Sequence, residues 1–160
     1  MYSPDPGTGE ESSSISAAFP LWVSPSADPA LSLEAVGLLP LINVAVLEDL
    51  ETELAGPALV QRFARDYAAM WDQRSTRLAA AVERQDVAAT LDAAISLKIT
   101  SAMLGGERLS KLAELLERVV GAGDFALGRT VMDRVTVDGK ATIAELQATY
   151  IAGGQDLEHT

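Results

Sequence analysis

Apolar residues recur at helical spacing through most of the chain from Leu31 onward. One example is the run that contains Leu47, Leu50 and Leu54, which Gly56 ends. A similar apolar stripe follows Pro57 and reaches about Gln85. The complete pattern predicts helices over residues 31–39, 40–55, 57–85, 87–104, 107–120 and 125–151.

Residues that favour helix ends flank several of these segments. Ser32 or Asp28 is expected to cap the first helix, Asp86 the helix over 87–104, and Asp124 the last one. Gly105 and Gly106 are expected to end the helix over 87–104. Pro40 occupies a position where a first-turn proline is tolerated, so we place it inside the second helix.

Two places in the last helix depart from a plain helical pattern. The pair Asp138-Gly139 is expected to form a kink or an exposed turn, because glycine costs about 1 kcal/mol in a helix interior. Residues 131–137 show a weak alternation that a strand could also produce.

The elements together predict an all-α fold, an antiparallel four-helix bundle with a short extra N-terminal helix. We expect the bundle to span residues 31–152 and to be followed by a flexible tail over 153–160. Residues 1–30 are rich in Pro, Ser, Gly and Asp, which predicts a disordered leader. Its apolar segment from Phe19 to Val23 is either a mobile patch or a peptide that docks on an apolar surface.

The composition of the chain argues against several classes of function. The formal net charge of −11 disfavours nucleic acid as a partner. With no cysteine and one histidine, His159 near the end of the chain, we expect no metal, no cofactor and no catalytic triad. No phosphate-binding loop or nucleophile elbow is present, so we expect no enzyme activity.

No apolar run reaches the roughly 18 residues that span a bilayer, and the first residues lack the basic region of a secretory signal. We therefore expect no membrane association and a cytoplasmic location.

Residues 91–117, LDAAISLKITSAMLGGERLSKLAELLE, resemble the signature helix of the histidine-containing phosphotransfer (HPt) family. The pattern of that family is H-x-L-K-G-x-x-x-x-x-G, and Leu97, Lys98 and Gly105 fall in register with it. Ile95 stands at the histidine position and Ile99 at the first glycine position. An isoleucine side chain has no atom that accepts a phosphoryl group.

The resemblance implies a scaffold that has kept its shape and lost its chemistry. In the family, the histidine is exposed and exchanges phosphate with a receiver domain, the lysine steadies the phosphoryl group, and the glycine leaves room for the partner. The resemblance therefore implies a phosphotransfer-incompetent protein of two-component signalling that binds a receiver domain or a histidine kinase. Lys98 would contact the partner, and Ile99 would add apolar bulk to the same surface.

Helical geometry puts a set of candidate binding residues on one face. Leu91, Ile95, Lys98 and Ala102 share that face, with Ile99 at its edge, and Ala93, Leu97, Thr100 and Leu104 lie opposite. Only one of these apolar faces can pack on the bundle core. Either the helix is covered on both sides, or Leu91, Ile95 and Ile99 form an exposed patch.

Lys98, Arg108 and Lys111 either form a basic cluster beside this patch, which would complement an acidic receiver pocket, or are ordinary surface cations. The candidate partner-binding residues are thus Leu91, Ile95, Lys98, Ile99, Ala102 and Arg108. An alternative from another class is a helical structural or oligomerisation module that self-associates, for example as a homodimer, through Leu91, Ile95 and Ile99.

Overall fold

The computed structural model describes residues 31–151 of the 160-residue chain. The helices reported below all belong to the unit of the chain that begins at Ser32. The predicted leader, its segment from Phe19 to Val23, and the predicted tail at 153–160 lie outside the described residues. Every regular element from residue 31 to 151 is helical, which confirms the all-α class. Residues 131–137, where a strand was considered, are part of a helix.

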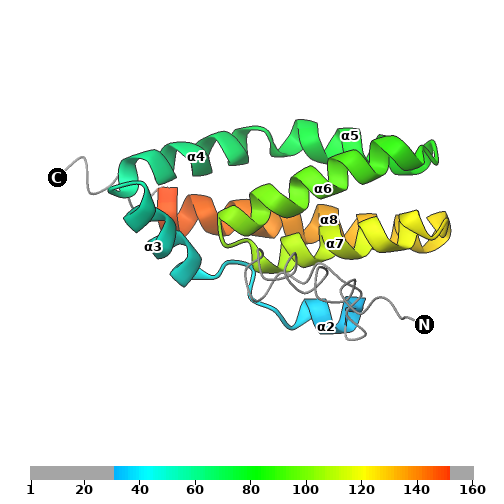
Figure 1. Cartoon of the computed structure of the whole chain (residues 1–160), viewed down its shortest axis with the longest axis horizontal. Helices are drawn as coiled ribbons and strands as arrows, with labels where there is room; N and C mark the ends of the chain where they lie inside the picture. Colours follow the sequence, from blue (N-terminus) through cyan, green and yellow to red (C-terminus); the bar gives the residue numbers. More distant parts are fainter. Residues whose placement is uncertain (1–30, 152–160) are drawn as a thin grey trace, which may run out of the picture. The chain divides into compact units, whose positions relative to one another are not determined.

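The elements follow one another with short connections (Figure 1). They are α2 (Leu33–Gly37), α3 (Val44–Glu53), α4 (Pro57–Ala69), α5 (Trp71–Glu83), α6 (Val87–Met103), α7 (Glu107–Gly121), α8 (Phe125–Glu145) and the π-helix η1 (Leu146–Ile151).

Three of the expected N-caps are present. The side chains of Ser32, Asp86 and Asp124 accept hydrogen bonds from the backbone N–H groups three residues ahead, at 3.2, 3.1 and 2.9 Å. Each of them satisfies a donor that the first helical turn leaves unpaired. Gly105 follows the last residues of α6 with a φ of +78°, as expected for the end of that helix.

The prediction of one helix over residues 57–85 is wrong, because the chain bends at Met70 between α4 and α5. Met70 has a ψ of −2°, well away from the roughly −42° of an α-helix. The bend contains neither glycine nor proline, so the sequence carried no signal for it.

The second helix also begins later than predicted. Pro40 precedes α3, and the side chain of Asn43 caps the helix by accepting from Ala45 N–H at 3.1 Å. The segment before the cap is bonded to the α6–α7 turn instead: Pro40 O accepts from Arg108 N–H at 3.2 Å, and Asn43 N–H donates to Gly105 O at 2.7 Å. These tertiary hydrogen bonds hold residues 40–43 in an extended path.

The core is formed mainly by α5, α6, α7 and α8. Each of these helices contacts two of the others: α6 packs on α5 and α7, and α8 packs on the same two helices. Within this group, from α5 to α8, each helix runs in the opposite direction to the one before it (Figure 1). The most deeply buried large side chains in this group are Leu78, Val82, Leu104, Leu109, Leu112, Leu116, Val120, Val131 and Val135. Around this group, α2 packs on α7, α3 on α4 and α6, and η1 on α4 and α8.

The pair Asp138-Gly139 does not form an exposed turn. Both residues are buried within the continuous helix α8. A Cβ added at Gly139 would overlap the six-membered ring of Trp71. Glycine is therefore present because the indole at the start of α5 lies directly on the backbone of α8.

Replacing Gly139 should expose this constraint. We expect Gly139→Ala to lower the free energy of unfolding by about 2 kcal/mol or more, because overpacking outweighs the gain in helix propensity. Urea denaturation followed by circular dichroism measures the change. The matched control is Gly121→Ala, where an added Cβ meets nothing within 4 Å and the change should stay within about 0.5 kcal/mol. If Gly139→Ala costs no more than Gly121→Ala, the indole does not constrain this position.

Helix α6 is tied to α4 by a buried hydrogen bond. The hydroxyls of Tyr67 and Ser101 lie 2.6 Å apart, and both residues are buried. Desolvation raises the pKa of Tyr67 to about 12, and the hydrogen bond to Ser101 offsets only part of that rise.

The pKa of a second tyrosine, Tyr150, is also raised, first by burial and then by its 2.5 Å hydrogen bond to the Glu51 carboxylate.

The raised pKa of Tyr67 predicts a loss of stability at alkaline pH. Between pH 10 and 12 the unfolded tyrosine loses its proton while the folded one keeps it, so the folded state is penalised as the pH rises. A shift of this size corresponds to about 3 kcal/mol. Denaturation curves recorded from pH 8 to pH 12 should show that Tyr67→Phe removes this part of the decline. An equal alkaline decline in both proteins would contradict the assignment.

Candidate functional site

Helix α6 has one thoroughly buried side and one side that faces solvent. The buried side consists of Thr90, Ala94, Leu97, Ser101 and Leu104, each 3% exposed or less. It packs against α5 and α7, with α3 near the C-terminal end. Leu97 and Leu104 were expected on this side; Ala93 and Thr100, which were also placed there, are half-buried at its edges.

The exposed apolar side chains of α6 are Val87 in its first turn, which is 42% exposed, and three residues further along the helix. Ile95, Ile99 and Met103 are 37%, 51% and 46% exposed, and their spacing of four residues puts them in line along α6. We call these three residues the α6 apolar strip. The alternative that the Ile95 side is covered within residues 31–151 is therefore excluded for Ile95 and Ile99, whereas Leu91 and Ala102 are half-buried beside the strip.

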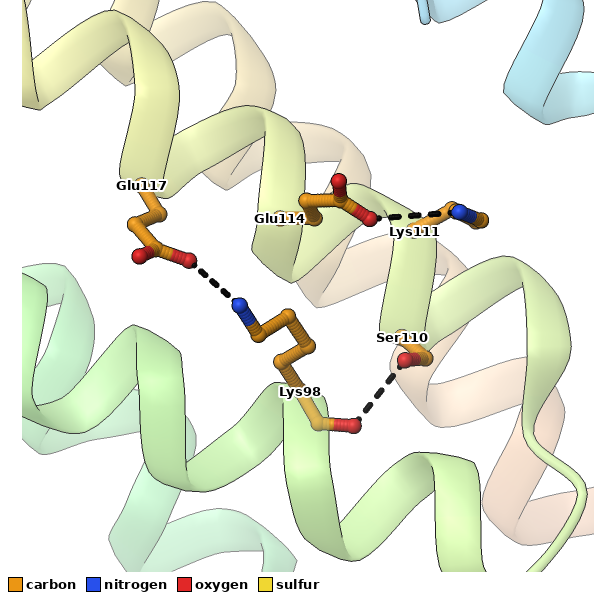
Figure 2. A network of polar contacts seen from close by, with 5 residues as sticks. All are labelled: Lys98, Ser110, Lys111, Glu114 and Glu117. Carbon is orange, nitrogen blue, oxygen red and sulfur yellow. Dashed lines mark hydrogen bonds and ion pairs between the residues drawn. The ribbon is translucent and has the colours of Figure 1, made fainter. Parts of the chain in front are cut away.

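Lys98 is engaged on the flank of the strip that faces α7. Its Nζ donates to Glu117 Oε1 at 2.8 Å, and its backbone carbonyl accepts from Ser110 Oγ at 2.9 Å (Figure 2). Both side chains of the ion pair are less than a third exposed. The ammonium group is thus neutralised by its own chain and joins α6 to α7.

The basic cluster proposed beside the patch is not a set of unpaired cations. Figure 2 shows Lys111 paired with Glu114 on α7, at 3.2 Å, away from Lys98. Arg108 donates through Nε to Leu39 O at 2.8 Å, and its Nη1 lies 4.0 Å from Asp138 Oδ1 on α8. Each of the three cations has an acidic partner, so the structure does not bring them together as one positive surface.

Sequence reasoning missed Met103, which extends the strip by one helical turn. The signal was present, because Met103 continues the spacing of Ile95 and Ile99. The other flank was also missed: Arg74 on α5 donates through Nη2 to Ser96 Oγ at 3.0 Å, next to Ile95 in the chain. No sequence pattern indicates that contact, because it joins two helices.

The side chains of the strip offer apolar contact area. Isoleucine and methionine side chains supply apolar area, and Lys98 is held by a carboxylate. Among the described residues, no group of three or more His, Cys, Asp or Glu side chains is placed to hold a metal ion. None of the described helices is both long enough and apolar enough to cross a bilayer.

Comparison of the chain with protein-family models, with curated proteins and with solved structures gave no match. The resemblance of residues 91–117 to the HPt family therefore stays a prediction from the sequence.

The exposure of the strip predicts how α6 tolerates charge. Ile95→Asp should change the free energy of unfolding by only about 1 kcal/mol, because the side chain already contacts water. Leu97→Asp, two residues away and 3% exposed, should cost several kcal/mol or prevent folding, because it buries an unpaired charge. Thermal and urea denaturation measure both. A large loss for Ile95→Asp would mean that Ile95 is part of the core.

Proposed function

We propose that this protein is a phosphotransfer-incompetent, HPt-like protein of two-component signalling. It binds the receiver domain of a response regulator, or a histidine kinase, through the α6 apolar strip and carries no phosphate. The observation that carries the proposal is the placement of Ile95 and Ile99, which occupy the histidine and glycine positions of the resemblance and are exposed on α6.

The packing of the helices supports the proposed scaffold. Helices α5 to α8 each contact two others of the group and reverse direction in turn, which is what an antiparallel four-helix bundle of the HPt type requires. Gly105, a third position of the pattern, has a positive φ, and an added Cβ would lie 2.5 Å from Asn43 O. Its glycine character therefore has a structural reason that does not depend on phosphate chemistry.

The state of Lys98 supports binding without transfer. A lysine that steadies a phosphoryl group needs its ammonium free to face that group. Here Glu117 Oε1 holds the ammonium at 2.8 Å. With no acceptor atom at Ile95 and this lysine already paired, the strip offers a partner apolar contact area in place of a phosphate site.

A second candidate uses the same residues in a structural module. Three exposed apolar side chains in line on one helix are also what a self-associating helical protein presents. In that reading the strip of one copy packs against the strip of another. The two candidates differ in what covers the strip, so one set of variants tests both.

The test is a binding assay with the full chain, receiver domains from the same cell and a histidine kinase domain. We expect one of them to bind and Ile95→Asp to weaken the complex at least about 100-fold, because a charge in a desolvated contact costs several kcal/mol. The matched control is Val137→Asp, a charge at a 58% exposed apolar position on α8, which should leave binding unchanged.

Sedimentation velocity on the same variants separates the two candidates. A dimer that Ile95→Asp dissolves, with no binding of receiver or kinase domains, would support the structural module and overturn the signalling proposal. Stable phosphorylation of the protein by a phosphorylated receiver domain would overturn its description as phosphotransfer-incompetent.

A further inference from the structure

A groove between α5 and α6 lies on the flank of α6 that faces away from Lys98 and Glu117. The groove is open to solvent on one side and has a volume of about 320 Å³, at the lower end of the size range of small-molecule sites. Its apolar lining includes the buried side chains of Leu78, Ala81 and Leu97. Ala89 and Ala93 line it from α6, and the small size of these alanines leaves the space between the two helices open.

Three arginines line the same groove, although the chain as a whole has a net charge of −11. They are Arg74, Arg77 and Arg84, all from α5 or its C-cap, and Asp92 is the one carboxylate among the lining residues. Like charges at this helical spacing repel one another. This local excess of positive charge sets the groove apart from the rest of an acidic protein.

None of the three arginines is held in a short, buried ion pair with a carboxylate among the described residues. Arg74 donates one solvent-exposed hydrogen bond to the neutral hydroxyl of Ser96 across the groove, at 3.0 Å. Arg77 has no ion-pair partner among the described residues. Arg84 lies 3.7 Å from Asp86, and both of those side chains are more than two-fifths exposed. Guanidinium donors of this kind match the oxygens of a carboxylate or phosphate in pairs.

We propose that this groove binds a small organic anion. Its carboxylate or phosphate lies against Arg74 and Arg77, and its apolar part lies on Leu78, Ala81 and Leu97. The site is distinct from the α6 apolar strip, so the inference does not rest on the proposed signalling function. A soluble metabolite and a lipid headgroup share this chemistry, and the concave shape and limited volume favour the soluble molecule.

The test uses hexyl phosphate, which combines the two features, with inorganic phosphate and hexanol as its separate halves. Titrations of the ¹⁵N-labelled full chain should shift amide signals of α5 and α6 around the groove. Hexyl phosphate should bind about tenfold more tightly than either half, because only the whole molecule meets both the arginines and the apolar floor. Signals that shift equally over the whole surface, or no shift in the groove, would overturn the proposal.

Two kinds of variant test separately whether binding depends on the arginine charge and on the open volume of the groove. Arg77→Gln, at an exposed position, should weaken hexyl phosphate binding about tenfold. The control Arg62→Gln removes the same charge from an exposed position on α4 and should leave binding unchanged. Ala93→Leu should fill the groove and reduce the affinity for hexyl phosphate to that for inorganic phosphate, with the fold checked by circular dichroism. If Arg62→Gln weakens binding as much as Arg77→Gln, the effect is one of net charge and the site does not exist.

A sedimentation experiment with lipid vesicles tests whether the bound anion is a soluble molecule or a lipid headgroup. Vesicles of phosphatidylcholine with phosphatidic acid should not bring the protein down on sedimentation, while hexyl phosphate still binds in solution. Sedimentation that depends on Arg77, without binding of hexyl phosphate, would overturn a soluble ligand.

Discussion

The structure depends on how α6 is held. Its inner side is buried against α5 and α7, and polar contacts hold it at two places. On the buried side, Ser101 shares a hydrogen bond with Tyr67 of α4. On the flank toward α7, Lys98 is bonded to α7 both through its ammonium and through its carbonyl oxygen. Because these contacts set the rotation of α6 about its axis, they also decide that Ile95, Ile99 and Met103 face the solvent.

The two flanks of the exposed strip differ in charge. Toward α7, the cation Lys98 is neutralised by Glu117. Toward α5, arginines exceed carboxylates around the groove, and Arg74 is bonded to a neutral serine. An incoming partner that covers the strip would therefore meet a neutral border on one side and a positive border on the other. Electrostatic asymmetry of this kind favours one orientation of the partner over its reverse.

Helix caps and the helical class could be predicted from the sequence, whereas contacts between helices distant in the chain could not. Ser32, Asp86 and Asp124 act as caps because capping involves residues only three positions apart. The helical class follows from periodicity in the same way. The exposure of Ile95 and Ile99 does not, because apolar residues on two faces of the helix left open which side packs on the core. The bend at Met70, the late start of α3 and the pairing of Lys98 with Glu117 depend on residues brought together only by folding. Gly139 shows the difference most clearly: its glycine suggested a weak point, and the reason for it is a tryptophan far away in the chain.

The contact between Trp71 and Gly139 also gives the protein an internal optical probe. Trp71 is 4% exposed, and its Nε1 is buried without a hydrogen-bond partner among residues 31–151. An indole screened from water in this way emits at shorter wavelengths than one in solvent. Since Trp71 begins α5 and lies on α8, its emission reports whether these two helices are docked, independently of their helical content, once the second tryptophan, Trp22, is replaced by phenylalanine.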